Sequence, residues 1–232
     1  MQTVSFRTLL GSPGAASAAL LYGCVALLCT RIPLLNYLGY EFSALLALIA
    51  GLVAGLLTVR PVREASRGGA DAPVPPLTAR AVGSSAAVNL LLLALPLAII
   101  SGNALFVRNC SLAEGLAFFF LLAPVSVLFG VALGFFCAVH SAHPRTLFLL
   151  LCFLLLVYSA GLGYFTPAVF SYNFLYGFFP GLTYDEALPV TRTLVLFRLL
   201  TLFVAAALLW AGMVTVADAG AGGISWRRVG TL

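Results

Sequence analysis

The feature that most constrains this chain is a series of long apolar runs that carry almost no charge. A helix needs about 20 consecutive apolar residues to cross the hydrocarbon layer of a bilayer. The sequence therefore predicts an all-α, polytopic transmembrane helical bundle of about six spans, forming one integral membrane domain over residues 1–232. The predicted spans are 12–30, 40–59, 83–106, 114–139, 146–166 and 190–216.

Composition supports lipid rather than water as the surrounding solvent. Charged residues make up 8% of the chain and hydrophobic residues 62%. A soluble domain carries about 25% charged residues, because its surface must be solvated. Too few charges are present to cover a water-facing shell around 232 residues.

The distribution of arginine predicts an orientation. With six spans, eight arginines fall on one face and four on the other. Cytoplasmic loops carry an excess of basic residues, so both termini are predicted to be cytoplasmic. The net charge of +5 is explained in this way, without a nucleic-acid partner. All basic residues are arginine and alanine is abundant, which favours a bacterial cytoplasmic (inner) membrane as the location.

Two connecting segments differ from each other. Residues 60–82 mix arginine with Gly and Pro, which predicts an irregular cytoplasmic loop. Residues 164–189 lie on the opposite face and are rich in Tyr and Phe, yet Pro167 and Pro180 interrupt them. Aromatic residues concentrate at bilayer interfaces, so this segment is predicted to be a re-entrant or surface-lying element before the last span.

Small residues and prolines mark features inside the spans. Small residues four apart allow close approach of helices in lipid, where packing drives association. Two such pairs predict helix contacts: Gly51 with Gly55, and Gly130 with Gly134. The mid-span prolines Pro96 and Pro124 predict kinks, because proline cannot donate a helical hydrogen bond.

Motifs for catalysis and cofactors are absent from the sequence. The chain has no lysine, so it has neither a Walker A loop nor a lysine Schiff base. No acid lies in the middle of a predicted span, and no GxSxG or HExxH occurs. The two histidines, His140 and His143, are too few for a metal site. We therefore predict no catalytic residue, no metal and no cofactor, and favour a role other than catalysis.

Polar and aromatic residues are predicted to gather on the outer face, where they would contact a substrate or partner. Arg198 is unusual, because it lies about two turns inside the last span, where a charge costs up to about 3.5 kcal/mol. It is expected to snorkel outward or to pair with an acid such as Glu41 or Asp185. The predicted contact residues are Glu41, Arg108, Glu114, Tyr172, Asn173, Tyr176, Asp185, Glu186, Arg192 and Arg198.

Three functions are compatible with these patterns. Six spans, a basic loop and a membrane-dipping segment resemble, in architecture alone, the permease of an ABC-type exporter. Its partners would be membrane lipid and a separate ATPase that docks on the cytoplasmic face, where 60–82 lies. The first alternative is a scaffold or anchor subunit that contacts other membrane subunits. The second is a membrane enzyme acting on lipid-linked substrates, using the acids and arginines of the outer face.

Overall fold

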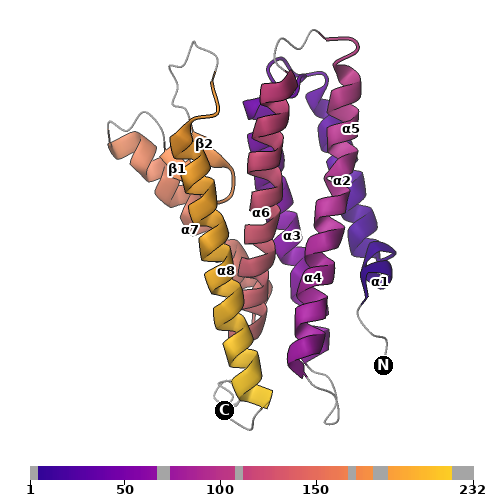
Figure 1. Ribbon diagram of the computed structural model, residues 1–232, viewed down its shortest axis with the longest axis vertical. Helices are drawn as coiled ribbons and strands as arrows, with labels where there is room; N and C mark the ends of the chain where they lie inside the picture. The colour runs from indigo at the N-terminus through magenta and orange to yellow at the C-terminus, as the bar shows by residue number, and fades with distance from the viewer. Residues whose placement is uncertain (1–4, 67–73, 108–111, 167–170, 180–187, 221–232) are drawn as a thin grey trace.

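The computed structural model describes residues 5–66, 74–107, 112–166, 171–179 and 188–220. Helices make up most of these ranges, and they run alternately up and down the long axis of the molecule (Figure 1). The elements are α1 (Phe6–Leu10), α2 (Pro13–Cys29), α3 (Tyr40–Ser66), α4 (Val74–Leu92), α5 (Ala94–Asn103), α6 (Leu112–His140), α7 (Pro144–Phe165), β1 (Ser171–Asn173), β2 (Gly177–Phe179) and α8 (Arg192–Gly220).

Five helices are long and apolar enough to cross a membrane: α3, α4 continued by α5, α6, α7 and α8. They coincide with five of the six predicted spans. The first predicted span forms α2, an apolar helix of 17 residues that is shorter than the other five. At 1.5 Å per residue α2 is about 26 Å long, close to the thickness of a hydrocarbon core. The fold is thus a helical bundle, compatible with an integral membrane protein.

Local sequence explains where several helices begin and break. Ser12 caps α2 by accepting a hydrogen bond from the backbone N–H of Ala15 at 3.2 Å, and Pro13 occupies the first turn. The helical run between Val74 and Asn103 is interrupted at Leu93. Pro96 lies just beyond this break, and it cannot donate a hydrogen bond to the carbonyl of Leu92.

The prediction of an irregular loop over 60–82 is wrong for most of that segment. Helix α3 continues to Ser66 and α4 begins at Val74. An ion pair one turn apart, between Arg60 Nε and Glu64 Oε1 at 2.8 Å, accompanies the extension of α3. Polar residues end an apolar run, but they do not end this helix, because Val62 and Ala65 in its last turns are still buried.

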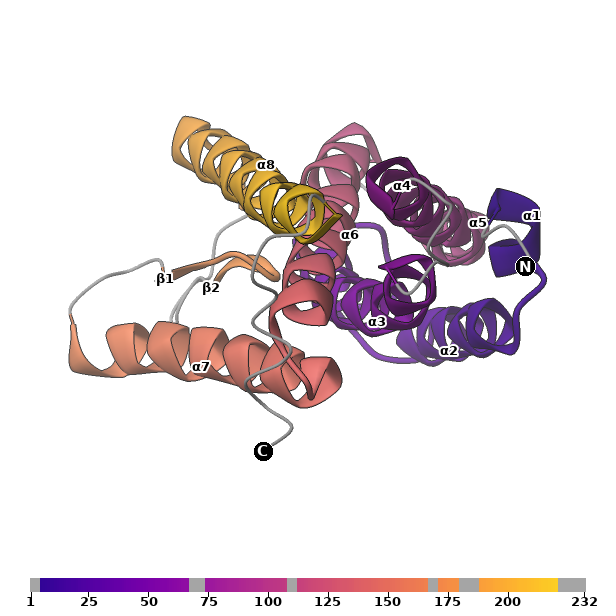
Figure 2. The same ribbon diagram turned by 90° about the horizontal axis from the view of Figure 1, so that it is seen from below.

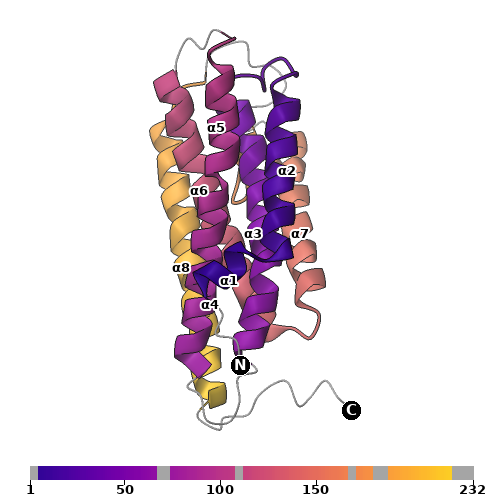
Figure 3. The ribbon, with the colours of Figure 1, turned by 90° about the vertical axis from the view of Figure 1, so that its right-hand side faces the viewer.

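Helices α3 and α6 form the centre of the bundle, and Figure 2 shows the other helices around them. In the most apolar stretch of each helix, the share that is buried inside the bundle is 56% for α3 and 67% for α6. The corresponding share is 17% for α7 and 22% for α8. In Figure 3, α1 lies across α4 on the side opposite α7 and α8. The central pair is therefore shielded by the peripheral helices.

Glycines bring α3 and α6 together. A Cβ atom on Gly130 would collide with the carbonyl oxygen of Gly51, and one on Gly134 would lie 2.9 Å from the carbonyl carbon of Gly55. A Cβ on Gly55 would in turn lie 2.9 Å from the carbonyl oxygen of Gly130. The two backbones are thus in direct contact, which only residues without a side chain permit.

Candidate functional site

Within the aromatic segment 164–189, residues 171–179 form a β-hairpin, whereas Tyr164 and Phe165 belong to the end of α7. Strands β1 and β2 are antiparallel, and Ser171 pairs with Phe179, Tyr172 with Phe178 and Asn173 with Gly177. The hairpin tip, residues 174–176, joins them. A two-stranded hairpin of this size is marginal by itself, so surrounding helices must hold it in place.

The hairpin lies between α7 and α8, which diverge from α6 on either side of it (Figure 2). Its tip points into the bundle, and Leu175 is fully buried there. Gly177 has a φ of 102°, and a Cβ at this position would lie 2.6 Å from the side chain of Leu122 on α6. Glycine is therefore required both by the turn and by the close packing against α6.

Side-chain hydrogen bonds attach the hairpin to α7. The hydroxyl of Ser171 donates to the carbonyl of Ser159 at 2.7 Å, and the two hydroxyl oxygens lie 2.9 Å apart. Asn173 Nδ2 donates to the carbonyl of Leu155 at 2.9 Å. The Tyr176 hydroxyl lies 3.0 Å from Ser159 Oγ. These bonds satisfy polar groups that would otherwise be exposed to an apolar environment.

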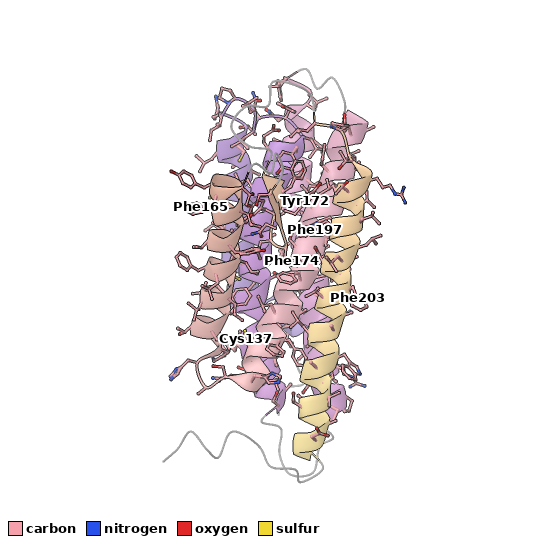
Figure 4. The ribbon with its side chains drawn as sticks, turned by 90° about the vertical axis from the view of Figure 1, so that its left-hand side faces the viewer. Cys137, Phe165, Tyr172, Phe174, Phe197 and Phe203 are labelled. Atoms are coloured by element: carbon pink, nitrogen blue, oxygen red, sulfur yellow. The ribbon has the colours of Figure 1, made fainter. Side chains whose placement is uncertain are left out.

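Aromatic rings join the hairpin to α3 and to α8. Tyr40 of α3 stacks on Phe178 with ring centroids 4.5 Å apart, and its hydroxyl donates to the Phe178 carbonyl. Phe197 of α8 lies 5.1 Å from Tyr172 and 5.2 Å from Phe174. Figure 4 shows Tyr172, Phe174 and Phe197 together between α7 and α8, whereas Phe203 points away. The rings fix the hairpin against both α3 and α8.

Arg198 is the charged centre of this region, and only 1% of it is exposed. Its Nε donates to the carbonyl of Leu121 at 3.1 Å, and its Nη2 donates to the carbonyl of Leu122 and to Ser126 Oγ, both at 2.6 Å. Its Nη1 donates to the carbonyl of Phe174 at 3.1 Å. The guanidinium therefore connects α8, α6 and the hairpin tip.

The expectation that Arg198 snorkels outward is wrong, because its side chain is buried. Two of the acids considered as its partners, Asp185 and Glu186, fall outside the described residues. All four of its acceptors in the described part of the chain are uncharged oxygens. Three lie on α6 close to Pro124, which cannot donate to the carbonyl of Phe120 and so interrupts the helical ladder beside them. Carbonyl dipoles and a hydroxyl thus replace the water that a buried cation would lose.

The structure brings together four of the predicted contact residues: Tyr172, Asn173, Tyr176 and Arg198. The others do not join this group. Glu41 and Glu114 lie in the first turns of α3 and α6, and Arg192 is exposed at the start of α8. Arg108, Asp185 and Glu186 fall outside the described residues.

Tyr37 lies beside Glu41 at the end of the bundle. Burial raises the pKa of the Tyr37 phenol, and the neighbouring Glu41 carboxylate raises it further. Tyr37 is therefore a neutral hydrogen-bonding group at ordinary pH. The described ranges hold no group of three or more His, Cys, Asp or Glu residues placed to bind a metal ion.

Three serines of the site were not predicted: Ser126, Ser159 and Ser171. The hydroxyl of Ser126 donates to the carbonyl of Leu175 and accepts from Arg198, so it links the two. Ser126 follows Pro124 by two residues within an apolar span, and a small polar residue there is a signal for a helix contact. The backbone carbonyls that complete the site carry no signal in a sequence.

The Tyr40 hydroxyl offers a test of the hairpin's attachment. Tyr40→Phe keeps the stacked ring but leaves the Phe178 carbonyl without this donor, so we expect stability to fall by about 1–2 kcal/mol. The measurement is SDS-induced unfolding of the detergent-purified protein, followed by tryptophan fluorescence. Tyr164→Phe is the matched control, because Tyr164 is exposed. Equal stability of both variants and the parent would show that the Tyr40 bond contributes nothing.

Comparison of the chain with protein-family models, with curated proteins and with solved structures finds no match. The interpretation of the site therefore depends on its own geometry.

Proposed function

We propose that this chain is the permease-like membrane subunit of a transporter that a separate ATPase energises. The observation that carries the proposal is a hairpin whose central tip residue, Leu175, is fully buried, and whose tip is held by a buried arginine between two apolar helices. At membrane depth, non-helical backbone is tolerated only inside protein or along a water-filled cavity. Ionisable residues within spans mark pathways more often than packing sites.

Transporters commonly combine such irregular backbone with broken helices near the substrate path. This chain has the irregular backbone of the hairpin, and Pro96 removes one helical hydrogen bond where α4 meets α5, inside one span. The hairpin is re-entrant in this proposal, entering from the face where α7 ends and α8 begins. The path would run between α7 and α8, which the hairpin separates (Figure 2).

The energy source must be a second polypeptide if ATP drives transport, because this chain has no lysine for a Walker A loop. The end of the bundle formed by the last turns of α3, the first turns of α4 and the connection from α6 to α7 suits its docking. Arg63 ties this end together by donating to the carbonyls of Ser141 at 2.6 Å and Ala142 at 2.7 Å. The helical ends of α3 and α4 supply a firmer docking surface than the irregular loop expected from sequence.

The test is purification in a mild detergent, identification of bound proteins by mass spectrometry and assay of ATP hydrolysis. We expect a co-purifying ATPase with a lysine-containing phosphate loop. A stable complex without any ATPase would contradict the proposal and favour the scaffold function. A complex that retains the ATPase but hydrolyses no ATP would also count against it.

Orientation gives a separate prediction. Among the described residues, four arginines lie in the last turns of α3 and the first turns of α4 and α7, at the end of the bundle that includes Ala142, and the rule of basic cytoplasmic loops places that end in the cytoplasm: Arg60, Arg63, Arg80 and Arg145. In a cysteine-free background, Leu34→Cys at the other end should react with an impermeant maleimide in intact spheroplasts. Ala142→Cys should react only after permeabilisation. The reverse pattern would contradict the predicted orientation.

A further inference from the structure

Two hydrogen-bond donors on the helices point at consecutive carbonyls of the hairpin tip. Arg198 Nη1 donates to the carbonyl of Phe174, and the Ser126 hydroxyl donates to the carbonyl of Leu175. The donors are adjacent, because Nη2 of the same guanidinium lies 2.6 Å from Ser126 Oγ. Two carbonyl oxygens of the tip therefore accept hydrogen bonds from one pair of adjacent donors, the Arg198 guanidinium and the Ser126 hydroxyl.

The orientation of Arg198 does not depend on the hairpin. Three of its four hydrogen bonds, from Nε and Nη2, end on α6, at Leu121, Leu122 and Ser126. Without the tip, the guanidinium would still be held by these three bonds, and the two donors that the tip now satisfies, Arg198 Nη1 and the Ser126 hydroxyl, would face the vacated space. Such a donor set is organised in advance for an acceptor with two or more oxygens.

The chemistry of that acceptor follows from charge and surroundings. A planar guanidinium beside a hydroxyl suits a carboxylate or a phosphate, and the four present acceptors are all uncharged. Phe174 would withdraw with the tip, and the two rings that it contacts would remain on the helices: Phe197 of α8, with ring centroids 5.2 Å apart, and Phe129 of α6, with ring centroids 5.6 Å apart. A ligand must therefore have an apolar part next to its oxyanion.

We propose that the hairpin tip occupies the binding site for the oxyanion of an amphiphile, a carboxylate or phosphate on an apolar tail. Binding requires the tip to withdraw, so the tip acts as an internal stand-in for the substrate. This inference rests on the transport function proposed above and names its substrate class.

Binding is tested by isothermal titration of the protein, purified in a neutral detergent, with decanoate and with decyl phosphate. Binding of one and not the other identifies the oxyanion. Arg198→Gln is expected to weaken binding about tenfold or more, and Ser126→Ala severalfold, since each removes hydrogen bonds to a charged group. Arg145→Gln is the matched control, because Arg145 is exposed on the far end of α7 and should bind as the parent does. Equal affinity for decanol would overturn the proposal, because an apolar pocket alone would explain it.

Withdrawal of the tip is tested by a reversible lock. Ser159 and Ser171 have hydroxyl oxygens 2.9 Å apart, so Ser159→Cys with Ser171→Cys, in a background without other cysteines, joins β1 to α7 as a disulfide. The oxidised protein should lose binding and the reduced protein should regain it. Equal binding in both states, or no binding of either amphiphile by the parent, would overturn the proposal.

The two proposals fail separately. A protein that retains its ATPase but binds neither amphiphile would contradict the substrate class alone. A protein that binds an amphiphile through Arg198, but co-purifies with no ATPase, would contradict the energised transporter and leave the binding site standing.

Discussion

Arg198→Met is expected to lower the free energy of unfolding by at least about 3 kcal/mol, the largest effect of any polar substitution in the described part of the chain. Methionine has a similar length and removes the cost of a charge inside a span, about 2.5–3.5 kcal/mol. Against that gain stand four lost hydrogen bonds from a charged donor, each contributing about 1.5–3 kcal/mol. The losses exceed the gain, so the net effect is destabilising.

The measurement is SDS-induced unfolding of the purified variants, compared with Arg145→Met, which replaces an exposed arginine and should change stability by less than about 0.5 kcal/mol. Arg198→Lys should be intermediate, because an ammonium keeps the charge but has three donors and cannot span the same four acceptors. If Arg198→Met is as stable as the parent, the arginine does not hold the hairpin, and its contacts only offset its own burial.

The helices were the predictable part of this fold, because their signal lies in composition. The runs 114–139 and 146–166 correspond closely to α6 (Leu112–His140) and α7 (Pro144–Phe165). The end of α3 was placed too early, at residue 59, because hydropathy falls where Arg60 begins a polar stretch. The exposed pair Arg60 and Glu64 lowers the hydropathy of this stretch, although Val62 remains buried in the core and the ion pair supports the helix.

The hairpin could not be predicted as a strand pair. Each strand has three residues, too few to show an alternating pattern, and its conformation depends on partners distant in sequence. The acceptors of Arg198 show why: three are backbone carbonyls, which every residue possesses. Sequence identified the costly arginine and the aromatic segment separately, and only the fold shows that one holds the other.

Gly130→Ala is expected to destabilise the protein by about 2–3 kcal/mol, through the backbone contact between the two central helices. The added methyl group would collide with the carbonyl oxygen of Gly51 and would lie 3.1 Å from its Cα. Both neighbours are backbone atoms, so no side chain can rotate away, and α3 and α6 would have to separate. Separation would weaken the apolar contacts along both central helices, which together bury most of the core.

The matched control gives the opposite sign. Gly161 of α7 has nothing within 4 Å of an added Cβ, so Gly161→Ala introduces no clash. Alanine favours a helix over glycine by about 0.5–1 kcal/mol, and this variant should therefore be as stable as the parent or more stable. Unfolding in SDS measures both. Because the chemical change is identical, a difference of sign between the two positions can only come from the contact of α6 with α3. Equal stabilities would mean that the two central helices are not in backbone contact, and the arrangement of the whole bundle around them would have to be revised.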